Sequence, residues 1–188
     1  MQVKEVIALA AQNLGRNDLK EALDVGEEAR AEGVKEELTS LLRCYNYVEN
    51  EIALEYFPLR CEETLEEGDG KLLYTHFSRA PVFVHKADDA AGNKVDFKMF
   101  PAYLSLPAGI GKVTVTYSYA PEKKGENDES AFGERISARL MSYGVVSEFL
   151  LTAARYSEAD MWQQRYREAL RAAGILRRRL AVRARRWV

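Results

Sequence analysis

The sequence has few of the residues that most often build metal or redox centres. Its 188 residues include only two cysteines and two histidines. Cys44 and Cys61 show no CxxC spacing, which argues against a zinc or redox motif and suits a reducing compartment. His76 and His85 fit neither the i, i+4 pair of a helical metal site nor a zinc-finger spacing. We therefore expect no metal and no other cofactor.

Long apolar runs are also absent. No segment approaches the roughly 18 apolar residues of a membrane span. Residues 1–19 mix acidic with apolar side chains and do not resemble a secretory signal. The chain is 47% apolar and 30% charged, a balance typical of a globular protein rather than a disordered one. The sequence predicts a globular protein that is cytosolic at synthesis and does not bind a membrane.

Familiar catalytic motifs are missing as well. The stretch AGIGK, which ends at Lys112, invites a phosphate-loop interpretation, but a strand follows it where such a loop needs a helix N-terminus. The sequence contains no GxSxG or HExxH motif. Its adjacent acid pairs lie in polar turns and are interpreted as solvated surface. We expect no enzymatic activity, although a triad assembled from distant residues stays open.

Charge is distributed unevenly along the chain. The net charge is −2. Residues 177–188 contain six arginines and no acids, whereas the first 176 residues carry 21 basic and 29 acidic side chains. An acidic body therefore precedes a basic tail. Such a tail is typical of a segment that binds an anionic surface on a protein, a nucleic acid or a lipid.

Apolar spacing predicts three N-terminal and two C-terminal helices. Apolar residues recur at intervals of three and four, which places them on one face of each helix. Gly15 and Gly174 are expected helix ends, and Pro58 ends the long third helix. Asp18 and Ser157 are the expected N-caps of the second and fifth helices. The predicted helices cover about residues 3–14, 19–32, 34–56, 134–154 and 157–173.

Between the two sets of helices the apolar period changes to two, which is typical of half-buried strands. The alternation is clear in residues 113–119 and 95–99. Residues 81–87 and 72–77 are two further expected strands, and residues 68–70 are expected to form a hairpin turn. After Pro121 the polar run KKGENDES lacks large apolar residues, which predicts a mobile loop.

These elements predict an α+β protein. Because strands interrupt a set of helices, the simplest arrangement is one helical bundle with an inserted antiparallel β-meander. The expected divisions are residues 1–56 plus 134–174 for the bundle, 57–121 for the β module, 122–133 for the mobile loop and 175–188 for the basic tail.

The tail, ILRRRLAVRARRWV, is the leading candidate for a binding site. Its arginines suit salt-sensitive binding to phosphates, but the acidic body shows no basic stripe or stacking motif. Its amphipathicity is modest for a membrane-surface helix, and a solvated tail is the simplest alternative. The leucines and the tryptophan add apolar anchors, which favours docking into an acidic groove on a partner protein. The predicted contact residues are Arg177, Arg178, Arg179, Leu180, Arg183, Arg185, Arg186 and Trp187.

Three segments resemble proteins of phage head and tail morphogenesis clusters: LLRCYNYVENEIALEYFPL, VTVTYSYAPEKK and ERISARLMSYGVVSEFLLTAARYSEADMWQQRYREAL. In element order the chain is similar to the head-tail connector adaptors, or head completion proteins, of tailed bacteriophages and prophages. The resemblance implies a helical bundle with an inserted β domain. It also implies a homo-oligomeric ring, twelvefold in this family, that docks on the portal protein and extends the DNA channel towards a tail or stopper protein.

Further expectations follow from this resemblance. The basic tail would correspond to the C-terminal arm with which adaptors hold the portal. The polar loop or the β module would face the next ring or the channel, where an acidic wall lets DNA pass without sequence specificity. The protein would assemble in the host cytoplasm and remain in the virion at the head-tail junction. The loop residues concerned are Lys123, Lys124, Glu126, Asp128 and Glu129.

Two alternatives stay open on sequence grounds. One is a nucleic-acid-binding regulatory protein that uses the arginines of the tail. The other is a tail completion or minor tail protein, which the sequence does not separate from an adaptor.

Overall fold

The computed structural model describes residues 1–175, and its chain divides into two compact units. The helical unit comprises residues 1–49 and the chain from Lys124 onwards, and the β module comprises residues 50–123. Helices and antiparallel sheets are thus both present, which confirms the α+β class. The polar segment that follows Lys123 belongs to the helical unit rather than to a separate loop.

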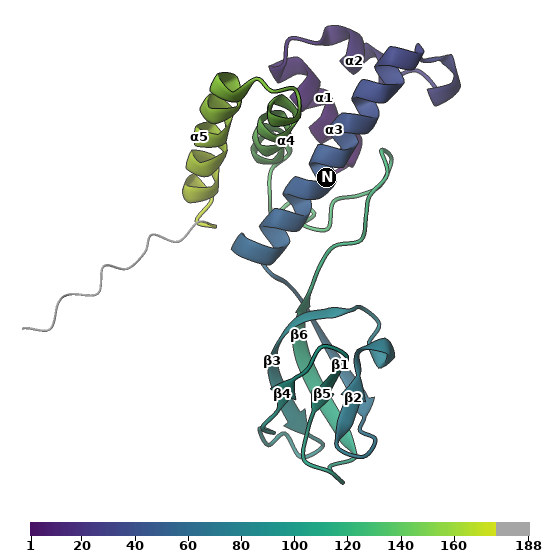
Figure 1. The fold of residues 1–188 in the computed structure, drawn as a ribbon, viewed down its shortest axis with the longest axis vertical. Coiled ribbons are helices and arrows are strands. Elements are labelled where there is room, and N and C mark those ends of the chain that lie inside the picture. The colour runs from purple at the N-terminus through teal and green to yellow at the C-terminus, as the bar shows by residue number, and fades with distance from the viewer. Residues whose placement is uncertain (176–188) are drawn as a thin grey trace, which may run out of the picture. The chain divides into compact units, whose positions relative to one another are not determined.

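The helices follow the predicted apolar spacing, with corrections at their ends (Figure 1). Helix α2 begins at Asn17, so Asp18 lies inside its first turn and binds Arg16 at 2.7 Å instead of capping the helix. Helix α5 begins at Tyr156, so Ser157 is not its cap either. Among residues 1–175, no helix combines the length and apolar character needed to cross a bilayer. The bounds are α1 (Val3–Asn13), α2 (Asn17–Ala22), α3 (Glu32–Glu51), α4 (Ala138–Thr152) and α5 (Tyr156–Ala172), with a 3-10 turn η1 (Glu27–Ala29).

Helix α4 is the centre of the helical unit. It packs against α1 and α5 and buries residues on nearly all of its faces. Gly144 permits the closest approach, because a Cβ atom there would lie 2.8 Å from Cγ1 of Val48 on α3 and 3.1 Å from Cε2 of Tyr166 on α5. Buried Ser147 donates to the carbonyl oxygen of Ala159 at 3.1 Å. Figure 1 shows α4 next to α5, with α1 and α3 on the side away from α5.

Two three-stranded antiparallel sheets form the β module. The strand order β1–β6–β3 corrects the expected meander, because the last strand lies between two earlier ones. Val95 enters the core outside any strand and donates its N–H to the carbonyl of Ala87 at 2.8 Å. The first sheet contains β1 (Leu59–Glu66), β6 (Lys112–Tyr119) and β3 (Pro81–Asp89); the second contains β2 (Lys71–Leu73), β5 (Tyr103–Ser105) and β4 (Lys98–Met99).

The ends of the β module meet at one position. After α3, a π-helical turn η2 (Ile52–Tyr56) leads into β1. Leu59, the first residue of β1, pairs directly with Tyr119, the last residue of β6. The chain therefore enters and leaves the module at neighbouring points, as an insertion between two helices requires.

The polar segment after the β module forms no helix or strand, and hydrogen bonds connect it to the helical unit. Asn46 on α3 accepts from the N–H of Lys124 at 2.6 Å and donates to its carbonyl at 3.0 Å. The N–H of Val3 donates to the carbonyl of Asp128 at 3.0 Å. The side chains in this run look like solvated loop residues in sequence, but several are partners of helices distant along the chain.

Candidate functional site

The described residues contain no group of three or more His, Cys, Asp or Glu side chains able to hold a metal ion. His85 packs against the ring of Phe83 at 5.0 Å, and His76 is exposed. Cys44 is buried, and burial raises the pKa of its thiol to about 11. The thiol is therefore protonated at neutral pH and is a poor nucleophile.

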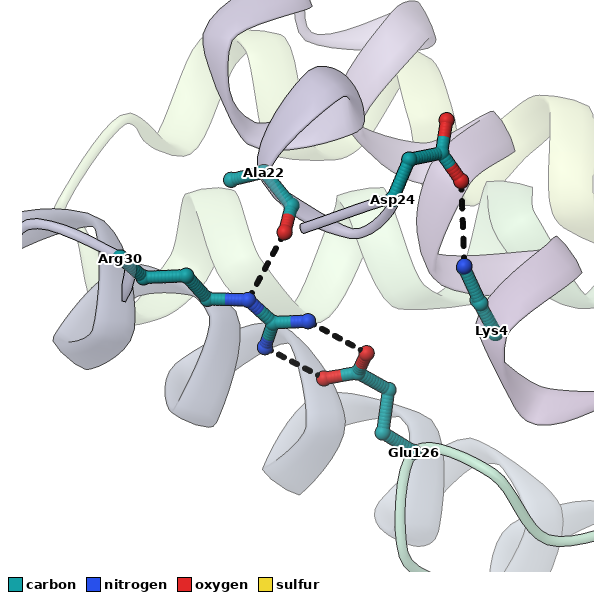
Figure 2. A network of polar contacts seen from close by, with 5 residues as sticks. All are labelled: Lys4, Ala22, Asp24, Arg30 and Glu126. Carbon is teal, nitrogen blue, oxygen red and sulfur yellow. Dashed lines mark hydrogen bonds and ion pairs between the residues drawn. The ribbon is translucent and has the colours of Figure 1, made fainter. Parts of the chain in front are cut away.

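The segment predicted to face a ring or channel is divided between buried and exposed positions. Figure 2 shows Glu126 receiving two hydrogen bonds of 2.7 Å from Arg30, whose Nε also donates to the carbonyl of Ala22 at 2.8 Å. Lys124 is half-buried against Asn46. Among the predicted residues, Lys123, Asp128 and Glu129 are exposed. Glu126 thus anchors the segment and does not present its charge to a partner.

The predicted tail contacts, Arg177 to Trp187, lie outside the described residues. Helix α5, which precedes them in the sequence, carries several arginine and aromatic side chains. A groove of about 730 Å³ lies between α4 and α5 and is lined by Arg139, Tyr143 and Arg165 among others. The groove opens along the part of α5 that continues towards the tail, since Ala172 and Ala173 also line it.

Four side chains beside this groove form a row in which two aromatic rings lie between two arginines. The Nε of Arg139 donates to the hydroxyl of Tyr143. The Tyr143 ring lies 5.6 Å from the ring of Trp162, and the guanidinium of Arg165 lies 4.8 Å from that same indole. We call Arg139, Tyr143, Trp162 and Arg165 the arginine-aromatic row.

The arginine-aromatic row favours an anionic partner. Within residues 1–175, neither Arg139 nor Arg165 forms an ion pair. Cation–π contacts orient a guanidinium while leaving N–H donors available. Carboxylates and phosphates are the groups that such donors bind in a bidentate manner. Glu168 lines the same groove and lowers its net positive charge.

The end of α4 and the first half of α5 expose large apolar side chains on either side of the turn that joins them. Tyr156 is 67% exposed and Met161 is 58% exposed, and Leu151 near the end of α4 is also exposed. Apolar side chains gathered at one place on a surface are typical of a protein interface. This turn and the arginine-aromatic row share the same pair of helices.

The β module carries a second exposed apolar surface, which we define as Leu73, Val82, Phe83, Met99 and Phe100. Val82 and Phe83 are consecutive yet both exposed, because the register of β3 shifts between Pro81 and Phe83. The N–H of Val84 contacts the Sδ of Met99 at 3.5 Å, which brings β4 next to β3.

A stacked pair of rings extends this surface towards β2. The Phe100 ring lies 4.9 Å from the ring of Tyr103 and nearly parallel to it. Tyr103 in turn pairs with Leu73 across β5 and β2. The apolar surface therefore continues from β3 through β4 and β5 to β2.

Sequence reasoning missed both surfaces. The arginine-aromatic row left a partial signal, since Arg139 and Tyr143 are four residues apart and Trp162 and Arg165 three apart, so each pair shares a helix face. The sequence does not show that the α4 face and the α5 face contact each other. The exposed apolar surface of the β module depends on a strand irregularity that alternation patterns do not predict.

Comparison with known proteins adds no relative: the chain matches no protein-family model, and no curated protein matches its sequence.

Proposed function

We propose that the protein is a structural adaptor of a phage head-tail connector, which forms a ring, docks on the portal protein and extends the DNA channel towards the tail. The main support is that both units expose apolar side chains to solvent, at the α4–α5 turn and across the β module. Surfaces of this kind mark contacts with other proteins. A chain with two of them suits an assembly in which each subunit has several neighbours.

The organisation of the chain supports the same function. A β module inserted between α3 and α4 matches the bundle with inserted β domain that the sequence resemblance implies. The insertion gives the subunit two separate surfaces for different neighbours. In the proposal, the basic tail contacts the portal, and DNA passes through the ring without sequence-specific contacts.

Native mass spectrometry of the full-length protein, alone and mixed with the portal protein encoded beside it, tests this function. We expect the protein to join the portal as a ring of defined stoichiometry. Deleting residues 176–188 should abolish portal binding while leaving the circular dichroism spectrum and the melting temperature unchanged. A variant whose tail residues are scrambled in order separates sequence-specific docking from charge attraction.

Each outcome of this experiment supports a different function or binding site. Portal binding by the truncated protein would remove the tail from the interface but keep the adaptor function. Binding to a tail protein and not to the portal would favour a tail completion protein. No association with either would contradict the proposal.

A nucleic-acid-binding function is the second candidate, because the arginine-aromatic row combines cations with rings that are able to stack on bases. Binding of labelled DNA measured across salt concentrations separates the two functions. A regulator would show affinity that falls steeply with salt and is lost in Arg165→Ala. An adaptor would show no measurable preference among DNA sequences.

A further inference from the structure

One edge of the helical unit carries uncompensated negative charge. Residues 16–37 contain eight acidic and four basic side chains. Glu21, Glu28 and Glu36 are exposed, and none of them forms an ion pair with another described residue. The exposed apolar residue Val25 lies among them in sequence. We call Glu21, Val25, Glu28 and Glu36 the acidic edge, which is formed by α2, η1 and the start of α3.

Helix α5 carries the opposite imbalance. Arg165, Arg167 and Arg171 are exposed and form no ion pair within the part of the chain that the structure describes. Of the acids on α5, Glu158 is already paired with Arg155 at 2.5 Å. Asp160 accepts from the neutral amide of Gln164 at 2.9 Å and keeps its charge, but the second half of the helix, residues 162–172, holds three arginines and one acid, Glu168. We call Arg165 and Arg171, with Met161, the basic face, because these three residues lie within about 120° of one another around α5, whereas Arg167 lies on the side opposite Arg165.

The acidic edge and the basic face lie at opposite ends of the helical unit. Helix α5 packs on α4, α4 packs on α1, and α1 packs on α2, so two helices separate α5 from α2. Figure 1 shows the same order within this unit. The two charged surfaces therefore do not neutralise each other within one chain, but those of two chains are free to meet.

A depression lies beside the acidic edge. It has a volume of about 370 Å³ and is lined by residues 23–26 together with Arg30 and Glu126. The ion pair of Arg30 and Glu126 is largely buried and fixes its wall, and the ion pair of Lys4 with Asp24 at 3.0 Å holds its rim (Figure 2). Met161 projects from α5 with 58% of its surface exposed and is of a size to enter such a depression.

We infer that two copies of this chain bind head to tail, with the basic face of one copy against the acidic edge of the next and Met161 in the depression beside Val25. This inference rests on the proposed ring and names the surfaces that form it. Contact between two different surfaces of identical subunits is heterologous, and such contacts close into rings when the rotation between neighbours permits. Opposite charges on the two surfaces fix the direction of the contact.

Charge reversal with reciprocal rescue tests the interface. In Arg165→Glu/Arg171→Glu both surfaces become acidic, and in Glu28→Lys/Glu36→Lys both become basic. We expect each variant alone to lose the higher-mass species that the wild-type protein forms, either free at high concentration or on the portal. An equal mixture should restore it, because alternating subunits again bring opposite charges together. Lys94→Glu/Lys98→Glu, two exposed positions of the β module, is the matched control and should assemble normally.

Cysteine cross-linking gives a second readout that does not depend on how charge reversal affects folding. Val25→Cys and Met161→Cys proteins, mixed and treated with a short bis-maleimide, should give a mixed dimer in high yield. Neither protein alone should cross-link beyond the level that the native cysteines of the wild-type protein give. Val25→Cys/Met161→Cys in one chain should give a ladder of higher multimers.

The outcomes separate the interface from the adaptor function. Efficient cross-linking of Met161→Cys to itself would indicate a two-fold contact and would overturn the head-to-tail interface. A ring that forms on the portal from either charge-reversed variant alone would also overturn it while leaving the adaptor function intact. Reciprocal rescue without portal binding would support the interface and contradict the portal role. A protein that stays monomeric with and without the portal contradicts both.

Discussion

Glu49, near the end of α3, is a carboxylate with 1% of its surface exposed. Its Oε1 accepts from the hydroxyl of Tyr45 at 2.8 Å, from Oγ of Ser130 at 2.9 Å and from the N–H of Ala131 at 2.8 Å. Burial raises the pKa of Tyr45 above its usual range, so its hydroxyl remains a donor. One buried oxygen thus joins α3 to the segment that returns from the β module.

Removing this acceptor should weaken the helical unit. Glu49→Ala removes the acceptor that three donors share, and of these Ser130 retains a contact with Sδ of Met141 at 4.0 Å. Each buried unsatisfied group costs about 1–3 kcal/mol, so we expect a loss of about 3 kcal/mol in the free energy of unfolding. Glu49→Gln keeps a carbonyl acceptor and should lose about 1–2 kcal/mol. Urea titration monitored by circular dichroism measures both losses. Glu36→Ala, an exposed change on the same helix, should stay within about 0.5 kcal/mol of wild type; equal effects of the Glu49 and Glu36 changes would contradict this role.

Glu63 on β1 makes the stability of the β module depend on pH. Burial alone would raise the pKa of this carboxyl, but hydrogen bonds from Ser78 and from the Tyr117 hydroxyl, the latter at 2.6 Å, hold the pKa below its ordinary value of 4.5. The carboxylate therefore stabilises the fold above the unfolded pKa, and this contribution is lost as the pH falls through the lower folded pKa.

We expect the free energy of unfolding of the β module to fall as the pH drops below about 4.5. Ser78→Ala should reduce that fall because it removes the hydroxyl that donates to Glu63, although the backbone N–H of residue 78 remains, whereas Glu66→Gln, an exposed change on the same strand, should not. Denaturant titrations at a series of pH values between 3 and 7, a range chosen around the ordinary carboxyl pKa, measure the slope. If the free energy of unfolding fell equally with decreasing pH in wild type and in Ser78→Ala, Glu63 would be excluded as the source of the pH dependence.

At the scale of elements, the segment that follows the β module is fixed by the ion pair of Arg30 and Glu126. The Arg30 side chain is 6% exposed and its guanidinium binds both carboxylate oxygens. A pair this buried has a large desolvation cost, and breaking it by changing one partner leaves an uncompensated charge.

A double-mutant cycle with Arg30→Met and Glu126→Gln should give a coupling energy of about 1–3 kcal/mol. Each single change should also speed proteolysis within residues 123–129. The cycle of Arg155→Met and Glu158→Gln is the matched control, because that ion pair is exposed and exposed pairs contribute about 0–1 kcal/mol. Coupling energies of the same size in both cycles would show that burial of the Arg30 pair does not strengthen its coupling energy.

Element type was predictable where one apolar face is buried, and less so where charges cover a strand. Helices α1 and α3 match their apolar stripes, and β6 matches its alternation. Strand β1 was missed, since LRCEETLE carries three glutamates and its half-buried positions include Glu63, whose burial depends on Ser78 and Tyr117. β5 is three residues long, too short for a period to appear.

The candidate surfaces were less predictable than the fold for a related reason. A sequence pattern reports which face of one element is apolar, but a binding surface requires that two elements meet. Arg139 and Arg165 lie on different helices, and Phe83 and Met99 on different strands. Only the packing of these elements brings the side chains together.

At the scale of the whole molecule, the two units should fold separately. Leu59 and Tyr119 are directly paired, and paired residues in an antiparallel ladder have Cα atoms about 4.5–5.5 Å apart. Replacing residues 57–121 with a linker of about four glycine and serine residues should therefore leave a helical unit that melts cooperatively, since so short a chain spans this gap. Residues 57–121 alone should give the circular dichroism spectrum of an antiparallel sheet, because their apolar core draws on both sheets of the module.

Non-cooperative melting of either product would show that the units depend on each other for stability. A shuffled-sequence insert of the same length between residues 56 and 122 provides the control. That insert separates the effect of chain length from the effect of the folded module.

The pairing of Leu59 with Tyr119 also bears on the order in which the chain folds. Helix α4 must find α3 across residues 52–137, most of which belong to the β module. Closing an unstructured loop of that length costs about 2–3 kcal/mol more chain entropy than closing one of a few residues. Once β1 and β6 are paired, the two ends of the β module already lie next to each other. The β module should therefore fold first, and its formation should accelerate closure of the helical unit around α4.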